Sequence, residues 1–279
     1  MGRPSVTMDE RIEQLDLSLF GHVASQTSVE DRRSLLAIQT AIRRSFPGYL
    51  YLEIGSHKGG SIQPHVVDPR CARIISIDPR PASQPDTRAV RYYYPENSTQ
   101  SMLDSLGKIP GADVSKIKTF DATTSQLNEK MIGLRPQLCF VDGEHTHEAA
   151  LRDARFCLSV LAENGAIAFH DAQLIYRGLQ TFLAELTARG RVFRAHVLPD
   201  FVFLIEFGTI HFSETDPLRG RVRDSYRAYL AGMLANDMFV QAYPLSIARM
   251  AKAVRAWHDS AIRPVMRKVE RLFKPKAFK

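Results

Sequence analysis

Acidic residues and histidines follow two of the predicted strands, at the point where each strand ends. Asp142 and His145 come after the fourth strand, and His170 and Asp171 come after the fifth. If these strands are neighbours in a parallel sheet, the four side chains lie over one crevice. Two carboxylates with His170 could hold a hard divalent cation such as Mg²⁺, and His145 is the natural base near neutral pH. The alternative is that Asp142 caps the next helix and that the histidines are ordinary first-turn residues; their number at two strand ends favours a site.

The first predicted strand ends in a glycine-rich turn, E-I-G-S-H-K-G-G-S, over residues 53–61. Such a turn between a strand and a helix lets a ligand approach the backbone closely. Its spacing is G-x-x-x-G-G, which lacks the middle glycine of the dinucleotide fingerprint G-x-G-x-x-G. Asp78 ends the next strand, where a carboxylate can accept hydrogen bonds from both hydroxyls of a ribose. Together the two features favour a nucleoside-containing ligand over a plain loop with an aspartate before Pro79.

A regular alternation of strands and helices would position these residues. A helix is predicted over 28–45, with Ser28 as its cap and Asp31 three residues on. Strand–helix alternation gives parallel strands joined by right-handed crossovers, but the connection between the last two strands is too short for a crossover. We therefore expect a doubly wound, Rossmann-like α/β sheet of seven strands with an antiparallel final strand. The strands are predicted at 49–54, 73–78, 116–120, 137–141, 166–169, 192–198 and 201–207, with further helices at 146–161 and 175–189.

The composition excludes several classes of protein. Hydrophobic residues make up 44% of the 279 residues and charged residues 24%, values typical of globular proteins. No run approaches the roughly 18 apolar residues of a membrane span, and the N-terminal sequence lacks the apolar stretch of a signal peptide. The 3 cysteines have no C-x-x-C spacing, which argues against a disulfide framework or a zinc site. We expect a cytoplasmic protein.

Positive charge is concentrated at the C-terminal end. Residues 217–279 hold 14 Lys and Arg against 4 Asp and Glu, whereas residues 1–216 carry a net charge of −3. Helices are predicted there over 219–241, 245–261 and 262–273.

Three partners could match this basic segment. The preferred interpretation is a helical extension packed on the body of the protein or on a second copy of the chain. The second is a set of interfacial helices that bind the protein to an anionic membrane surface, near a lipid-linked sugar acceptor. Nucleic acid ranks lowest, because few aromatic residues are interleaved with the basic ones.

Four sequence motifs carry a resemblance to a known family. They read EIGSHKGGS, SIDP, FVDGEHTHEAALRD and NGAIAFHDA, and their order and spacing extend over roughly residues 49–210. The chain resembles the class I S-adenosylmethionine-dependent methyltransferases. More narrowly, it is similar to the branch that contains the macrocin- and mycinamicin-type sugar O-methyltransferases and the cephalosporin-hydroxylase-like proteins. On this basis the chain is divided into an N-terminal helical segment (1–47), a methyltransferase domain (48–212) and a basic helical extension (213–279).

The resemblance implies a role for each motif residue. Ser61 would bind the methionine carboxylate, Asp78 the ribose, and Asp121 would lie beside the adenine. His145 would be the catalytic base. Relatives often have Glu or Asp where this chain has His170, and Tyr where it has His147. The implied cofactor-binding residues are Glu53, Gly55, Gly59, Ser61, Asp78, Asp121 and Asp142, and the implied metal ligands are Asp142, His170 and Asp171.

The function that follows is transfer of a methyl group from S-adenosylmethionine to a hydroxyl of a sugar or other small polyhydroxylated acceptor, assisted by Mg²⁺ or Mn²⁺. Three alternatives stay open. One is a nicotinamide-dependent oxidoreductase on a similar fold, which the missing glycine disfavours. Another is a non-catalytic S-adenosylmethionine-binding protein. The third is a methyltransferase that needs no metal, in which Asp142 and Asp171 only position the acceptor.

Overall fold

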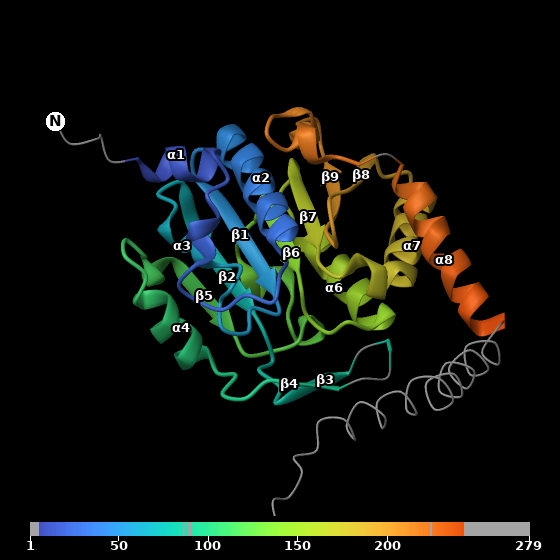
Figure 1. Cartoon of the computed structure of the whole chain (residues 1–279), viewed down its shortest axis with the longest axis horizontal. Coiled ribbons are helices and arrows are strands. Elements are labelled where there is room, and N and C mark those ends of the chain that lie inside the picture. Colours follow the sequence, from blue (N-terminus) through green and yellow to red (C-terminus); the bar gives the residue numbers. More distant parts are fainter. Residues whose placement is uncertain (1–5, 86, 89–90, 224, 243–279) are drawn as a thin grey trace, which may run out of the picture. The chain divides into compact units, whose positions relative to one another are not determined.

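The protein is built on one seven-stranded sheet (Figure 1). This computed structural model describes residues 6–85, 87–88, 91–223 and 225–242. The strand order is β5-β2-β1-β6-β7-β9-β8, and β9 runs antiparallel to both β7 and β8 while the other pairs are parallel. The strands are β1 (Tyr49–Ile54), β2 (Cys71–Ile77), β5 (Ile117–Phe120), β6 (Leu138–Val141), β7 (Gly165–Phe169), β8 (Phe193–Val197) and β9 (Phe203–Phe207). The predicted doubly wound sheet with an antiparallel final strand is confirmed.

The helices predicted over 28–45, 146–161 and 175–189 are present, and four shorter ones, α1, α3, α4 and α5, were not predicted. Ser28 accepts a hydrogen bond from the backbone N–H of Asp31, and the Asp31 carboxylate accepts one from Ser28 in return, which fixes the start of α2. The helix predicted over 175–189 begins earlier, at Ala172, directly after the Asp171 of β7's carboxyl end. The helices are α1 (Met8–Glu13), α2 (Val29–Ser45), α3 (Gln63–Val67), α4 (Thr99–Gly107), α5 (Glu129–Ile132), α6 (His147–Val160), α7 (Ala172–Ala188) and α8 (Tyr226–Ala242).

The sheet is buried on both faces. One core joins α2 to the face that carries Tyr51, Phe140 and Ala168, and the N-terminal residues Ile12 and Phe20 belong to the same core. On the opposite face, residues such as Leu52, Cys139 and Ile167 are also fully buried, and α6 contacts both β6 and β7. Residues 6–47 and the α/β domain are therefore packed around one sheet, within one compact unit.

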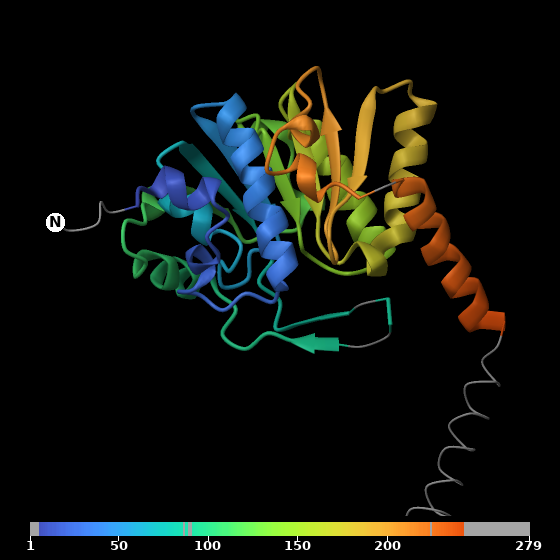
Figure 2. The same cartoon turned by 45° about the horizontal axis from the view of Figure 1, so that its top comes forward.

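A short hairpin was not predicted. It consists of β3 (Ser83–Pro85) and β4 (Arg91–Tyr93), and Figure 2 shows it lying across the carboxyl end of the main sheet. The Thr87 backbone N–H donates a 3.1 Å hydrogen bond to the carbonyl oxygen of His145. β4 is exposed, β3 is partly buried, and both are too short to show a hydrophobic alternation, so the sequence carried no signal for them.

The C-terminal predictions are tested only in part. A 3-10 turn at Arg219–Arg221 and helix α8 lie where one helix was predicted over 219–241. The predicted helices at 245–261 and 262–273 lie outside the described residues. Among the described helices, none combines the length and the hydropathy that crossing a bilayer would require.

A buried ion pair fastens α2 to Asp68, the residue that follows α3. The side chains of Arg43 and Asp68 are both 0% exposed, with Arg43 Nε 3.1 Å from Asp68 Oδ2. Asp68 also accepts hydrogen bonds from Gln39 and from the Tyr49 hydroxyl, so its charge is fully coordinated by groups from α2 and β1. The pair therefore holds together elements that are distant in sequence.

We predict that Arg43→Met lowers the free energy of unfolding by about 3–5 kcal/mol, because the substitution leaves a buried carboxylate without its cation. Arg44→Met is the matched control. Arg44 is 39% exposed and pairs with Glu13, so its loss should cost less than about 1 kcal/mol. Urea unfolding of both variants measures the difference, and equal losses would contradict a special role for the buried pair.

Candidate active site

The glycine turn after β1 lies in direct contact with the end of β6. Gly55 has φ +87°, and a Cβ added to it would lie 2.2 Å from the carbonyl oxygen of Asp142. Gly59 also has positive φ (+83°), and a Cβ on Gly60 would lie 2.9 Å from Cα of Ser25 in the N-terminal loop. The backbone of Asp142 therefore excludes a side chain at position 55, and only glycine fits there.

Glu53 and Ser61 form a buried pair beneath this turn. The Ser61 hydroxyl donates a 2.8 Å hydrogen bond to Glu53 Oε1, and the Tyr51 hydroxyl donates to Oε2. Burial raises the pKa of Glu53 to about 8. In this arrangement Ser61 offers its oxygen lone pairs to the cavity, so binding a methionine carboxylate would require its hydroxyl to rotate. Its predicted role stays a prediction.

Asp78 is held in place from both sides. The backbone N–H of His57 donates to its Oδ2 at 2.8 Å, and the backbone N–H of Arg80 donates to its Oδ1 at 2.7 Å. The Arg80 guanidinium lies 3.4 Å from Oδ2. The carboxylate is 3% exposed and lines the cavity, as a ribose partner must.

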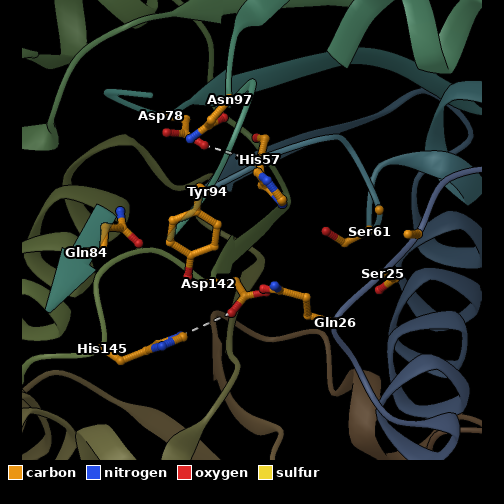
Figure 3. Close-up of a pocket in the computed structure, with 14 residues that line it drawn as sticks. Ser25, Gln26, His57, Ser61, Asp78, Gln84, Tyr94, Asn97, Asp142 and His145 are labelled. Carbon is orange, nitrogen blue, oxygen red and sulfur yellow. Dashed lines mark hydrogen bonds and ion pairs between the residues drawn. The ribbon is translucent and has the colours of Figure 1, made fainter. Parts of the chain in front are cut away.

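Gly55, Ser61 and Asp78 line a cavity of about 550 Å³ that is open to solvent, whereas Glu53 and Gly59 do not belong to its wall. Figure 3 shows Asp78 and His145 at opposite ends of it, with Tyr94 and Asp142 between them. Sequence reasoning missed several lining residues from the N-terminal loop and from the β3–β4 region. They are Ser25, Gln26, Gln84, Tyr94 and Asn97.

A second cavity of about 350 Å³ adjoins the first at Gly55 and Gln84. Its walls include Pro79 and Ala122, which follow the carboxyl ends of β2 and β5, and the buried carboxylate of Asp153 in α6. A planar base linked to a ribose at Asp78 would reach this space. Asp121 lines neither cavity, since its side chain is 59% exposed and accepts a hydrogen bond from Thr99. Its predicted contact with adenine stays a prediction.

The four residues at the ends of β6 and β7 converge as the sequence indicated. His170 Nδ1 lies 3.2 Å from Asp142 Oδ1 and 3.4 Å from Asp171 Oδ2. His145 Nε2 lies 3.4 Å and 3.3 Å from the same two oxygens. Three potential ligand atoms lie within 4.8 Å of one another: a carboxylate oxygen of Asp142, a ring nitrogen of His170 and a carboxylate oxygen of Asp171. The predicted metal ligands thus come together, with the predicted base beside them.

Charge in this cluster is balanced by the histidines. Burial alone raises the pKa of Asp142, but the charge of His170 and the hydrogen bond from His145 outweigh burial and hold the pKa well below its usual value. Burial lowers the pKa of His170, but the neighbouring Asp142, Asp171 and Asp31 carboxylates raise it well above normal. The crevice therefore requires positive charge, either as a proton or as a cation.

Sequence reasoning gave Asp31 only a helix-capping role. In the structure it also lies against the cluster: its carboxylate is fully buried, and Oδ2 is 3.2 Å from Nε2 of His170. In the sequence, Asp31 was visible only as a polar residue at a helix start. Capping residues are expected there, so nothing in the sequence pointed to His170.

The raised pKa of Glu53 predicts a pH-dependent stability. The folded protein keeps a proton on Glu53 up to about pH 8, whereas the ordinary glutamate value is 4.5. Stability from this group is therefore complete below pH 4.5 and falls by about 1.4 kcal/mol per pH unit as the pH rises toward 8. In the wild type, unfolding releases the proton of Glu53 over this pH range. The Glu53→Gln side chain does not titrate, so the unfolding free energy of this variant should fall less steeply. Urea unfolding from pH 5 to 9 without ligand measures both slopes, and parallel profiles would show that Glu53 titrates normally.

Comparison with known proteins bears on this site. Residues 52–172 match a family model described as a methyltransferase domain, and the match begins in β1 and ends just after Asp171. A search of curated protein sequences gave no match. Among solved structures, the chain is similar to a putative O-methyltransferase from Klebsiella pneumoniae (14% identity, 75% of this chain and 92% of that chain, TM-score 0.46). It is also similar to the O-methyltransferase NovP (12% identity, 63% of this chain and 78% of that chain, TM-score 0.48). A third similar structure is the O-methyltransferase TomG from Streptomyces achromogenes, which is involved in tomaymycin synthesis and was solved in complex with S-adenosylmethionine. Its identity to this chain is 14%, the match covers 74% of this chain and 93% of that chain, and the TM-score is 0.45.

The matched segment contains the glycine turn, Asp78 and the cluster at the ends of β6 and β7. The sheet that carries it is the seven-stranded sheet expected for this class. Over the matched residues, 52–172, the chain carries a methyltransferase domain.

Proposed function

We propose that the protein transfers the methyl group of S-adenosylmethionine to a hydroxyl oxygen of a sugar or other small polyhydroxylated acceptor, with the help of a divalent cation. The observation that carries this proposal is the convergence of Asp142, His170, Asp171 and His145 at one end of the cavity that Asp78 lines at the other (Figure 3). Asp78 is suited to the ribose, and the cluster is suited to an acceptor hydroxyl.

The cluster fits a cation. His170 is 5% exposed, and its Nδ1 is buried without a hydrogen-bond partner while two carboxylate oxygens face it. Asp142, His170 and Asp171 would hold the ion. A divalent cation bound there would supply the positive charge that lowers the pKa of a neighbouring hydroxyl.

His145 is placed to take the proton. Burial lowers its pKa, but the hydrogen bond to Asp142 and the charge of Asp171 outweigh burial and leave it raised. As the acceptor oxygen attacks the methyl carbon, the carbon–sulfur bond breaks and the proton passes to the imidazole of His145. The products are the methyl ether and S-adenosylhomocysteine. General-base catalysis of this kind contributes about 10²–10⁴-fold.

The other functions predict different behaviour. A nicotinamide oxidoreductase would bind NAD in the same cavity, and the match to a methyltransferase family model speaks against it. A non-catalytic protein would bind S-adenosylmethionine without turnover, and a metal-independent enzyme would work in a chelator.

We predict that Asp78→Ala weakens S-adenosylmethionine binding more than tenfold, because two ribose hydroxyls lose an ionised acceptor; such bonds contribute about 1.5–3 kcal/mol. Asp121→Ala is the matched control, since its exposed carboxylate lines neither cavity. Calorimetric titration measures both affinities, and thermal melting shows whether each variant folds. A folded Asp78→Ala with unchanged affinity would remove Asp78 from the site.

We predict that turnover requires a divalent cation and that Asp171→Ala loses most activity while still binding S-adenosylmethionine. The reason is that Asp171 belongs to the cluster but does not line the cofactor cavity. The assay is methyl transfer to a panel of sugars and phenols with and without EDTA. Full turnover in excess chelator would select the metal-independent mechanism.

We predict that His145→Gln lowers kcat by about 10²–10⁴-fold with little change in cofactor affinity. The base acts only when neutral, so the wild-type rate should fall toward low pH as His145 becomes protonated. The variant should lose this acidic limb of the pH–rate profile. A variant profile identical to that of the wild type would mean that another group takes the proton.

A further inference from the structure

One buried carboxylate of the N-terminal segment reaches the cluster without facing the cavity. Asp31 lies in the first turn of α2, 139 residues before His170 in the chain, and both are buried. Its Oδ1 accepts a 3.0 Å hydrogen bond from the backbone N–H of Phe201, and its Oδ2 accepts one of 3.0 Å from the backbone N–H of Ser28. Asp31 is thereby fixed by two backbone donors before it meets the histidine.

The contact between Asp31 and His170 determines which imidazole nitrogen faces the crevice. Nε2 lies 3.2 Å from Asp31 Oδ2, and a carboxylate can only accept, so Nε2 must carry the proton. The other nitrogen, Nδ1, then presents its lone pair to the crevice. The ring is held from both sides, in edge contact with Phe140 and with Phe201.

Nδ1 faces two more acceptors. Asp142 Oδ1 and Asp171 Oδ2 lie 3.2 and 3.4 Å away, yet Nδ1 is buried without a hydrogen-bond partner. When Nδ1 is deprotonated, three electron-pair donors point toward one another, and a cation can take the place of the proton that Nδ1 otherwise carries between them. A histidine that ligates a metal characteristically gives its other ring N–H to a carboxylate, which is the arrangement of Asp31, His170 and the crevice.

The donor set of one imidazole nitrogen and two carboxylate oxygens differs from the all-oxygen surroundings that Mg²⁺ prefers. Imidazole is a good ligand for first-row transition metals, whose affinity for nitrogen is greater than that of Mg²⁺. We propose that Asp31 is a positioning residue that holds His170 as a nitrogen ligand, so that this centre takes a transition-metal dication such as Mn²⁺ in preference to Mg²⁺. This inference rests on the metal centre of the proposed function, but not on the identity of the acceptor.

Metal binding to the full-length protein, without S-adenosylmethionine or acceptor, tests the proposal. Electron paramagnetic resonance counts free and bound Mn²⁺, and Mg²⁺ is added as competitor. We expect the wild type to bind Mn²⁺ at least about tenfold more tightly than Mg²⁺. His170→Asp restores an all-oxygen set and should reduce this preference about tenfold, because Mn²⁺ loses its nitrogen ligand while Mg²⁺ gains an oxygen. An equal preference in the wild type and His170→Asp would overturn the proposal.

Spin-echo modulation of bound Mn²⁺ by ¹⁴N identifies the ligand directly. The modulation should be present in the wild type, absent in His170→Asp and retained in His145→Gln. The His145 variant is a stringent control, because its Nε2 lies beside the same two carboxylate oxygens. Modulation that persists in His170→Asp and disappears in His145→Gln would assign the nitrogen ligand to His145 and overturn the proposal.

Asp31 is tested separately. Asp31→Ala should weaken Mn²⁺ binding about 10–100-fold, the usual effect of losing the partner of a ligating histidine. Ser28→Ala removes a cap hydrogen bond from the same helix start but leaves the Asp31–His170 contact in place, so its Mn²⁺ affinity should equal that of the wild type. Equal losses in the two variants would make Asp31 a helix cap only and would contradict the positioning role.

If thermal melting shows that Asp31→Ala does not fold, Asp31→Asn takes its place, because an amide still accepts a hydrogen bond but carries no charge. The Mn²⁺ affinity of Asp31→Asn should then fall, and an unchanged affinity would contradict the positioning role.

One further result separates this inference from the proposed function. If the wild type binds neither Mn²⁺ nor Mg²⁺ but does bind S-adenosylmethionine, the metal centre is wrong while the methyltransferase assignment stands.

Discussion

The site depends on the backbone contact between Gly55 and Asp142. The carbonyl oxygen of Asp142 occupies the place where any side chain at Gly55 would lie, so the turn after β1 and the end of β6 approach as closely as backbone allows. This contact makes Asp142 a member of two sites. It lines the cavity that contains Asp78, and it is one of the carboxylates of the cluster that could hold a metal ion. The cofactor methyl group and the acceptor would thus meet where the two sites share a residue.

Burial of charge is the second constraint on this protein. Several ionisable groups lie in the interior, and each is stabilised in a different way. Arg43 and Asp68 neutralise each other, whereas Glu53 stays protonated because burial raises its pKa. In the cluster at β6 and β7, carboxylates outnumber fixed cations, so the histidines or a metal ion must supply positive charge. This unbalanced charge in the interior is the kind of feature that functional sites have.

The N-terminal segment contributes residues to the candidate site as well as to the core of the fold. Its loop provides Ser25 and Gln26 to the wall of the cavity, and α2 provides Asp31 to the histidine of the cluster. These contacts connect the cavity, the cluster that could hold a metal ion and the fold through one segment that precedes the first strand. The β3–β4 hairpin covers the same region from the other side, where the Thr87 backbone N–H is bonded to the His145 carbonyl oxygen (Figure 2).

The sequence by itself determined the sheet and the residues at its carboxyl edge. Buried strands and amphipathic helices have a clear hydrophobic period, and parallel strands end at one edge, so Asp142, His170 and Asp171 could be brought together from spacing alone. Only the tertiary structure decided that Asp31 bonds to His170, that Tyr94 lines the cavity and that Asp121 does not. These facts depend on how a loop or a helix packs across the sheet. That packing is set by the shapes of many side chains at once, and no local pattern in the chain records it.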